Sequence, residues 1–214
     1  MTETSMGGAD SRFRSTLWEV VRSAQEGEAA AVDRLLGDYW KPIYFFVRRK
    51  GKDVEAAKDL TQAFLGHFLE KDFLSKVRPE GGKFRSFVMA TLTNFLSNER
   101  RTSQARKRGG GLNFVEAEDD LKTADATPEK AFFKGWALTV LEQAMASLRA
   151  SVPAEDIALL EGKGPPDLSP SERKNRVFRL RGKLQHLLRE TVRTSMDNQG
   201  DPDSELRAIF ASLG

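Results

Sequence analysis

The amino-acid sequence predicts an all-α fold. Along most of the 214 residues, apolar side chains recur three and four positions apart, the spacing that places them on one face of a helix. No segment alternates apolar and polar residues for long enough to indicate a sheet. Residues that start and stop helices stand where these stripes begin and end. With 39% hydrophobic and 30% charged residues, the chain can bury one large core or two small ones.

The first third of the chain is expected to hold three helices and a short element. The second helix is expected to be broken or kinked at Pro42, and Asp53 can cap the third, over 56–69. A short element around 73–77 ends in the loop sequence RPEGG. The first two helices carry the stripes Phe13, Leu17, Val20, Val21 and Ala24, then Val32, Leu35, Leu36, Tyr39, Ile43, Phe46 and Val47.

The strongest helical pattern begins at residue 84. Helix-favouring polar residues continue it to Arg108, and the triple glycine 109–111 ends it. Its apolar face consists of Phe84, Phe87, Val88, Leu92, Phe95 and Leu96.

A second helical unit is predicted from residue 127. Thr127 and Pro128 are an N-cap and a first-position proline, and a brief helix over 157–160 precedes the turn EGKGPPD. SPSE at 169–172 is a capping box that starts another helix, and SELRAIFASL is expected to form a last short one. The two long stripes are Phe132, Phe133, Trp136, Val140, Leu141, Met145 and Leu148, then Val177, Phe178, Leu180, Leu184, Leu187, Leu188 and Val192.

The stretch between these units is acidic and has no sustained apolar stripe. Residues 112–126 are therefore expected to be a flexible linker. The predicted organisation is two small helical domains, 12–111 and 127–193, followed by a C-terminal extension over 194–214.

The composition argues against several classes of protein. The chain has no cysteine, no apolar secretory segment at its N-terminus and no run long enough to span a membrane, so we expect a soluble cytoplasmic protein. Its two histidines, His67 and His186, are far apart and do not have the spacing of a zinc site. RGGGL lacks the lysine and serine of a phosphate-binding loop. We therefore expect neither an enzyme nor a bound cofactor or metal.

Charge is distributed in blocks. Residues 116–129 carry six acids and one lysine, whereas 100–108 carry five basic residues and no acid, which points to a polyanionic partner for the basic block. The alternative is a solvated helix end whose cations complement the helix dipole. The basic residues of this block are Arg100, Arg101, Arg106, Lys107 and Arg108.

A second basic helix favours nucleic-acid binding. It follows a short helix and a capped turn, which is the layout of a helix-turn-helix whose second helix enters the major groove. Two basic helices joined by a linker suggest binding at two points. The basic residues of this helix include Arg173, Lys174, Arg176, Arg179, Arg181 and Lys183.

Two long segments resemble a known family. RPEGGKFRSFVMATLTNFLSNERRTSQARKRGGG, with the preceding GDYWKPIYFFVRRKGKDVEAAKDLTQAFLGHFLEKDFL, closely resembles region two of extracytoplasmic-function sigma factors of bacterial RNA polymerase. ATPEKAFFKGWALTVLEQAMASLRA and LSPSERKNRVFRLRGKLQHLLRETV resemble their region four less closely, with a shorter turn that contains two prolines. The resemblance covers about residues 14–193.

The resemblance implies that residues 84–98 capture the melted DNA strand. Phe84 and Phe87 lie on the apolar stripe and are better candidates for the core, whereas Asn94 and Asn98, on another face, favour base contacts. The candidate DNA-binding residues are Arg85, Asn94, Asn98, Arg100, Arg101, Arg106, Lys107, Arg108, Arg173, Lys174, Arg176 and Arg179.

The helix over 56–69 is implied to dock on the clamp helices of the largest subunit of core RNA polymerase. On a helical wheel, Leu65 and Leu69 lie about 100° and 140° from Phe64, outside the arc that faces the core. We expect these two leucines, with Asp59 and Gln62, to form the polymerase contact. The alternative is that another helix of the same domain covers them.

The same helix departs from the family at two positions, because Lys58 and Ala63 stand where members usually carry acids. Thr61 is a candidate phosphorylation site, since a phosphate would return about −1.5 to −2 charges to this surface. The alternative is that Thr61 is a half-buried helix residue. The expected partners are core RNA polymerase and promoter DNA. An anti-sigma factor or a Ser/Thr kinase is a candidate regulator, and no membrane association is expected.

Three functions compete. The first is an alternative sigma factor that directs promoter-specific transcription initiation. The second is a DNA-binding transcriptional regulator that has lost polymerase binding, which fits Lys58 and Ala63. The third is an RNA-binding or structural adaptor that uses the same basic surfaces.

Overall fold

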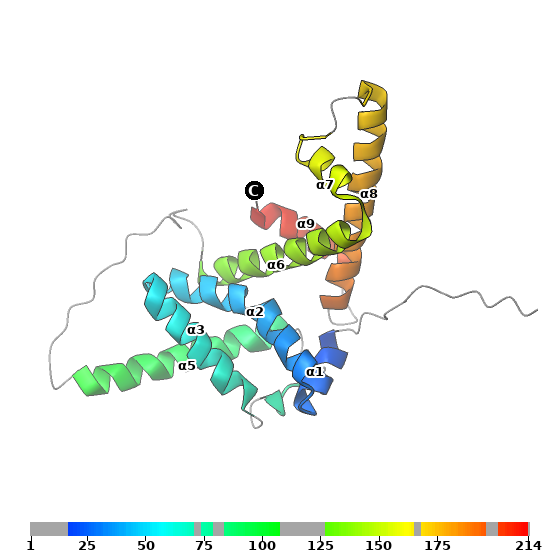
Figure 1. Ribbon diagram of the computed structural model, residues 1–214. Helices are drawn as coiled ribbons and strands as arrows, with labels where there is room; N and C mark the ends of the chain where they lie inside the picture. Colours follow the sequence, from blue (N-terminus) through cyan, green and yellow to red (C-terminus); the bar gives the residue numbers. More distant parts are fainter. Residues whose placement is uncertain are drawn as a thin grey trace, which may run out of the picture.

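The computed structural model describes residues 17–70, 74–78, 84–107, 127–164, 168–195 and 201–213. The described residues form helices and turns with no strand among them, so the all-α prediction is confirmed. In chain order, Figure 1 shows α1 (Leu17–Gln25), α2 (Ala29–Arg49), α3 (Val54–Leu69), α5 (Phe84–Lys107), α6 (Pro128–Ser151), α7 (Ala154–Leu160), α8 (Pro170–Ser195) and α9 (Pro202–Leu213). None of these helices has the length and apolar character that a membrane span requires.

The first core lies among α1, α2, α3 and α5. Phe84 is buried and packs edge-on against Tyr39 and Trp18, with ring centroids 5.2 and 6.0 Å apart. Burial of each such large apolar side chain contributes about 1.5–3 kcal/mol. Phe84 is therefore a core residue, as its place on the stripe predicts. The buried residues of this core include Leu17, Val21, Leu35, Ile43, Phe46, Phe64, Phe68, Val88 and Leu92.

Helix α2 runs through Pro42 without interruption. Of the two expected outcomes, a break or a kink, the break is therefore wrong. A proline in a helix removes the amide that would bond the carbonyl four residues earlier. Pro42 is itself buried, and the helix is held on both sides of it by core residues such as Tyr39 and Ile43. Tertiary packing outweighs the local cost of the proline here.

Helix α6 packs along α2. Gly135 makes this approach possible, because a Cβ at this position would lie 2.7 Å from Pro42 Cα. Phe132 joins the first core beside Tyr39 and Phe46, with ring centroids 6.4 and 6.5 Å away. The division into domains 12–111 and 127–193 does not anticipate this contact. The expected linker, 112–126, lies outside the described residues.

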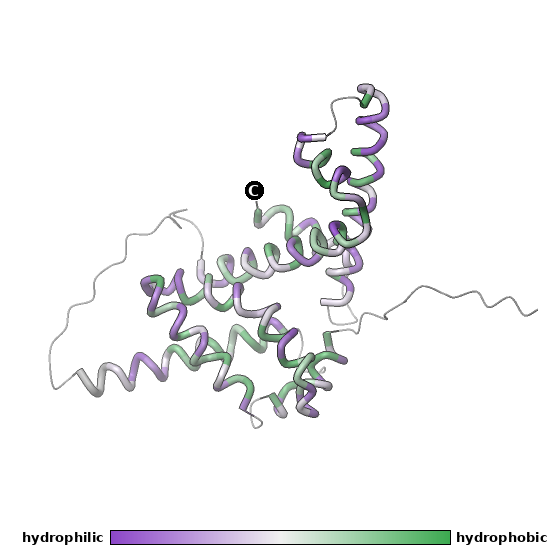
Figure 2. Tube along the Cα trace, in the orientation of Figure 1, coloured by the Kyte–Doolittle hydropathy of each residue, from purple (hydrophilic) through white to green (hydrophobic). Residues whose placement is uncertain are grey.

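The second core lies among α6, α8 and α9. The predicted last helix is present as α9, and its Leu206 and Ile209 pack with Trp136 of α6 and Val192 of α8. The N-terminal part of α8 extends beyond this core and carries α7 at its side (Figure 1). Figure 2 shows many hydrophilic residues along this projecting part and along part of the second half of α5.

The three predicted helix starts are confirmed. The Asp53 side chain accepts a hydrogen bond from the Ala56 amide at 2.7 Å, and Thr127 Oγ1 accepts from the Lys130 amide at 3.3 Å. Ser169 Oγ accepts from the Glu172 amide at 3.3 Å, while the Ser169 amide donates to Glu172 Oε2 at 3.1 Å. The last two bonds form the reciprocal capping box.

Candidate nucleic-acid interface

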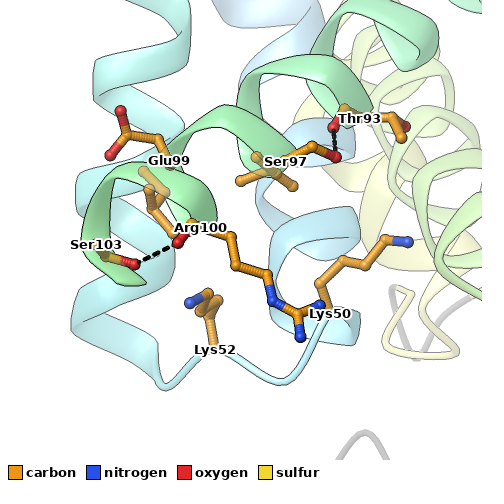
Figure 3. Close-up of a pocket in the computed structure, with 9 residues that line it drawn as sticks. Lys50, Lys52, Thr93, Ser97, Glu99, Arg100 and Ser103 are labelled. Atoms are coloured by element: carbon orange, nitrogen blue, oxygen red, sulfur yellow. Dashed lines mark hydrogen bonds between the residues drawn. The ribbon is translucent and has the colours of Figure 1, made fainter. Parts of the chain in front are cut away.

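A groove whose lining residues are mostly polar lies where α5 passes the connection between α2 and α3. It encloses about 470 Å³. Figure 3 shows Arg100 of α5 at the same opening as Lys50 and Lys52, which belong to the connection. The groove is lined by Lys50, Lys52, Leu60, Thr93, Leu96, Ser97, Glu99, Arg100 and Ser103.

The α2–α3 connection holds its two lysines in place by backbone contacts. Gly51 has a φ of +80°, which only glycine adopts readily, and its amide donates to the Arg48 carbonyl at 3.0 Å. The buried guanidinium of Arg48 donates to the Lys52 carbonyl at 2.5 Å. The Lys50 ammonium lies 5.4 Å from the centre of the Phe46 ring. Sequence reasoning missed Lys50 and Lys52. Their only signal is the basic run RRKGK at the end of a helix.

The groove offers acceptors as well as cations. Thr93 Oγ1 donates to the Met89 carbonyl and Ser97 Oγ to the Thr93 carbonyl, both at 2.8 Å, and Ser103 Oγ donates to the Arg100 carbonyl at 3.0 Å. Each hydroxyl thus uses its proton inside the helix and keeps an oxygen that can accept. A ligand with both anionic and donor groups, such as a nucleotide strand, matches this combination.

The predicted residues of α5 divide between two faces. Successive residues in a helix turn by about 100°, so Arg100 faces the groove while Arg101 points elsewhere. Asn94, Asn98 and Arg101 are exposed and share one face, because they are four and three residues apart. Helix α5 continues to Lys107, so Arg106 and Lys107 belong to its last turn, and Arg108 lies outside the described residues.

Arg85 is not part of either face. It lies in the first turn of α5, forms an ion pair with Glu205 of α9, and stands 4.9 Å from the centre of the Trp136 ring. The expected contact between Arg85 and DNA is therefore not available in this arrangement, because its guanidinium already has a carboxylate partner.

The basic residues of α8 also differ in their surroundings. Lys174 and Arg179 are exposed, and Arg173 is half-buried. Arg176 lies 3.7 Å from Asp156 of α7, which ties it to the preceding short helix. Phe178, predicted on the apolar stripe, is 78% exposed and lines a hollow with Arg173, Lys174 and Arg181. The stripe prediction is wrong at this residue, because α8 has left the core at this point.

The predicted polymerase surface of α3 is smaller than the sequence suggests. Asp59 and Gln62 are exposed, and Leu69 is half-buried. Leu65, expected to overhang the core, is instead a buried core residue. It lines a small apolar gap with Leu35 and Leu36 of α2, so the covering helix is α2. The alternative in which another helix covers this leucine is therefore correct.

Thr61 is not an accessible phosphorylation site in this structure. Its exposed fraction is 0%, and its hydroxyl donates to the Ala57 carbonyl at 2.7 Å. A kinase would have to displace α3 to reach it. The neighbouring Lys58 is exposed and pairs with Glu55 at 2.8 Å, which raises the pKa of its ammonium.

Within the described ranges, no three acidic or histidine side chains gather closely enough to hold a metal ion. Comparisons of the chain with family models, with curated proteins and with solved structures found no match.

Proposed function

We propose that this chain is an alternative sigma factor, which binds core RNA polymerase and directs promoter-specific initiation in the cytoplasm. The observation that carries the proposal is the pair of polar faces on α5. The groove cations Lys50 and Arg100 are suited to phosphates, whereas exposed Asn94 and Asn98 can donate and accept at base edges. Phosphate contacts supply affinity and base contacts supply sequence preference, and promoter recognition needs both.

The exposed cations of α8 form the second DNA contact in this proposal. Lys174 and Arg179 lie on the part of the helix that projects beyond the second core. The capping box and the preceding α7 give this part the layout of a helix-turn-helix. The proposal keeps two DNA-binding domains, 12–111 and 127–193, whose separation on a promoter requires release of the contact between α2 and α6.

The proposed polymerase contact on α3 consists of Asp59, Gln62 and Leu69. We assign the docking role to these three residues because Leu65, the fourth expected member, is buried in the core. The partner surface is the pair of clamp helices in the largest polymerase subunit, as the family resemblance implies. An anti-sigma factor that covers this surface would be a natural regulator.

Reconstituted transcription tests the proposal. The protein is mixed with core RNA polymerase and fragmented genomic DNA, and transcript start sites are sequenced. We expect start sites that share an upstream sequence, and fewer of them with Asp59→Lys/Gln62→Lys, a variant that leaves the DNA-binding faces intact. Core polymerase alone is the control. An identical set of start sites with and without the protein would reject the sigma-factor proposal.

A second candidate is a DNA-binding regulator without polymerase binding. The ion pair between Lys58 and Glu55 favours it, because this pair neutralises an acid on the surface that would meet the basic clamp. Co-sedimentation of the protein with core polymerase separates the two candidates. A sigma factor sediments with the enzyme, whereas this regulator binds the same DNA and remains in the free fraction.

A further inference from the structure

An ion pair joins two segments that are 120 residues apart in the sequence. Arg85, in the first turn of α5, donates to Glu205 Oε1 in the first turn of α9. The two side chains are only 18% and 10% exposed. An ion pair shielded from water in this way is much harder to break than one on the surface, because separation leaves a charge buried without a partner.

Two aromatic rings hold the guanidinium of Arg85 from α6. Its central carbon lies 4.9 Å from the centre of the Trp136 ring and 5.4 Å from that of Phe133. Such cation–π contacts add to the attraction of the charge pair. We call Arg85, Glu205, Phe133 and Trp136 together the latch. It ties α5, α6 and α9 at one point.

Helix α9 is firmly placed to hold its side of the latch. Asp201 caps its start, since its carboxylate accepts from the amides of Asp203 and Ser204 at 3.1 and 3.0 Å. Leu206 and Ile209 bury its apolar face in the second core. Asp203, on the exposed side, accepts from Arg189 of α8 at 2.7 Å. Glu205 is therefore presented to Arg85 by a helix that is fixed on two sides.

We propose that α9 is an intramolecular inhibitor of nucleic-acid binding, which acts by occupying Arg85. This inference rests on the proposed function and on the family resemblance, which implies that residues 84–98, Arg85 among them, meet the melted strand. A carboxylate and a phosphate are alternative partners for the same guanidinium fork. Nucleic acid that engages Arg85 must displace Glu205 from the guanidinium, so only molecules in which the latch is open can bind through Arg85, and the apparent affinity is lowered accordingly.

Glu205→Gln tests the inference, because it keeps the size of the side chain and removes its charge. Binding of a fluorescein-labelled single-stranded oligodeoxynucleotide is measured by anisotropy. We expect the variant to bind more tightly than the wild type, on the order of tenfold. Asp203→Asn is the matched control, since it breaks an exposed pair on the same helix without touching Arg85, and its affinity should equal that of the wild type. The double variant Arg85→Ala/Glu205→Gln should not show the tighter oligonucleotide binding expected of Glu205→Gln alone.

Hydrogen exchange of the wild-type protein provides a second readout that needs no substitution. Saturation with the same oligonucleotide should accelerate amide exchange in α9, because the displaced carboxylate loosens the helix. The proposal that the latch inhibits nucleic-acid binding would be overturned by either of two results. One is equal affinity of the wild type and Glu205→Gln for the oligonucleotide, and the other is unchanged amide exchange in α9 when DNA binds. Failure of the proposed function is seen in a separate measurement, because the protein then does not sediment with core polymerase, whatever the effect of Glu205→Gln on oligonucleotide binding.

Discussion

Burial decides which of the residues selected from the sequence remain available to a partner. On α3, Asp59 and Gln62 stay exposed, whereas Thr61 and Leu65 are enclosed. A helical wheel reports direction around one helix and does not show how far a neighbouring helix reaches over it. Here the core covers a wider arc of α3 than the helical wheel indicates, because Leu35 and Leu36 of α2 lie against Leu65. On α5, Asn94 and Asn98 are exposed, and no neighbour among the described helices covers them.

The two polar faces of α5 should affect DNA binding in different ways. Lys50→Ala and Arg100→Ala should each weaken binding to all sequences alike and reduce the salt dependence of log K by about 0.7 per lost phosphate contact on single strands. Asn94→Ala should instead relax preference at one base. Titrations at several salt concentrations check this, with Arg22→Ala, at an exposed position of α1, as control. A salt slope equal to that of the wild type would exclude phosphate contacts in the groove.

Asp38 of α2 should make stability depend on pH. Burial raises the pKa of this carboxyl above 3.8, against the opposing effects of Arg34 and of the hydrogen bond from Gln143. A raised pKa means that the folded state holds its proton more tightly, so stability is lost as pH rises from 3.8 through the folded pKa.

Asp38→Asn should therefore flatten this dependence and raise the free energy of unfolding near neutral pH by up to about 1 kcal/mol, because its amide oxygen still accepts from Gln143. Urea unfolding at several pH values measures it. Asp33→Asn, at an exposed position of the same helix, should change little. A variant that is less stable than the wild type at neutral pH would contradict the assignment.

At the scale of single elements, local signals predicted most of the fold. The caps at Asp53, Thr127 and Ser169 are formed by short-range hydrogen bonds, which the residue types alone specify. Predictions were wrong where long-range packing decides. Helix α2 continues through Pro42 because core residues hold it on both sides. Phe178 is exposed because this part of α8 extends beyond the second core. The groove was missed as a site for the same reason, since it combines α5 with a distant loop.

The capping box should control the start of α8, and with it the proposed reading helix. Ser169→Ala removes the acceptor for the Glu172 amide and should weaken the first turn by about 1 kcal/mol. Hydrogen exchange of the first-turn amides should therefore accelerate. Ser171→Ala, in the same turn but outside the box, should leave the exchange unchanged or slower, because alanine favours helix. Equal exchange in both variants would show that the turn is held by other contacts.

At the scale of the whole molecule, the two helical units are joined by contacts that no local pattern reveals. Gly135 meets Pro42, 93 positions earlier in the chain, and Arg85 meets Glu205 across a still longer interval. Gln143 of α6 also donates to Asp38, and Lys41 pairs with Glu142 at 2.5 Å. The two DNA-binding units can separate on a promoter only if these contacts break. The proposed function therefore requires that they break when the protein binds DNA.

The close approach of α6 to α2 can be tested with two glycines. At Gly135, an added Cβ would lie 2.7 Å from Pro42 Cα and 3.0 Å from the Phe45 ring, so α6 must move away from backbone that cannot yield. Gly135→Ala should therefore lower the free energy of unfolding by about 1–3 kcal/mol. Gly37→Ala is the matched control on α2, where an added Cβ meets nothing within 4 Å. There, the better helix propensity of alanine should raise stability by up to about 1 kcal/mol. Urea unfolding of both variants measures the difference, and equal stabilisation by both would show that α6 does not pack on α2 in solution.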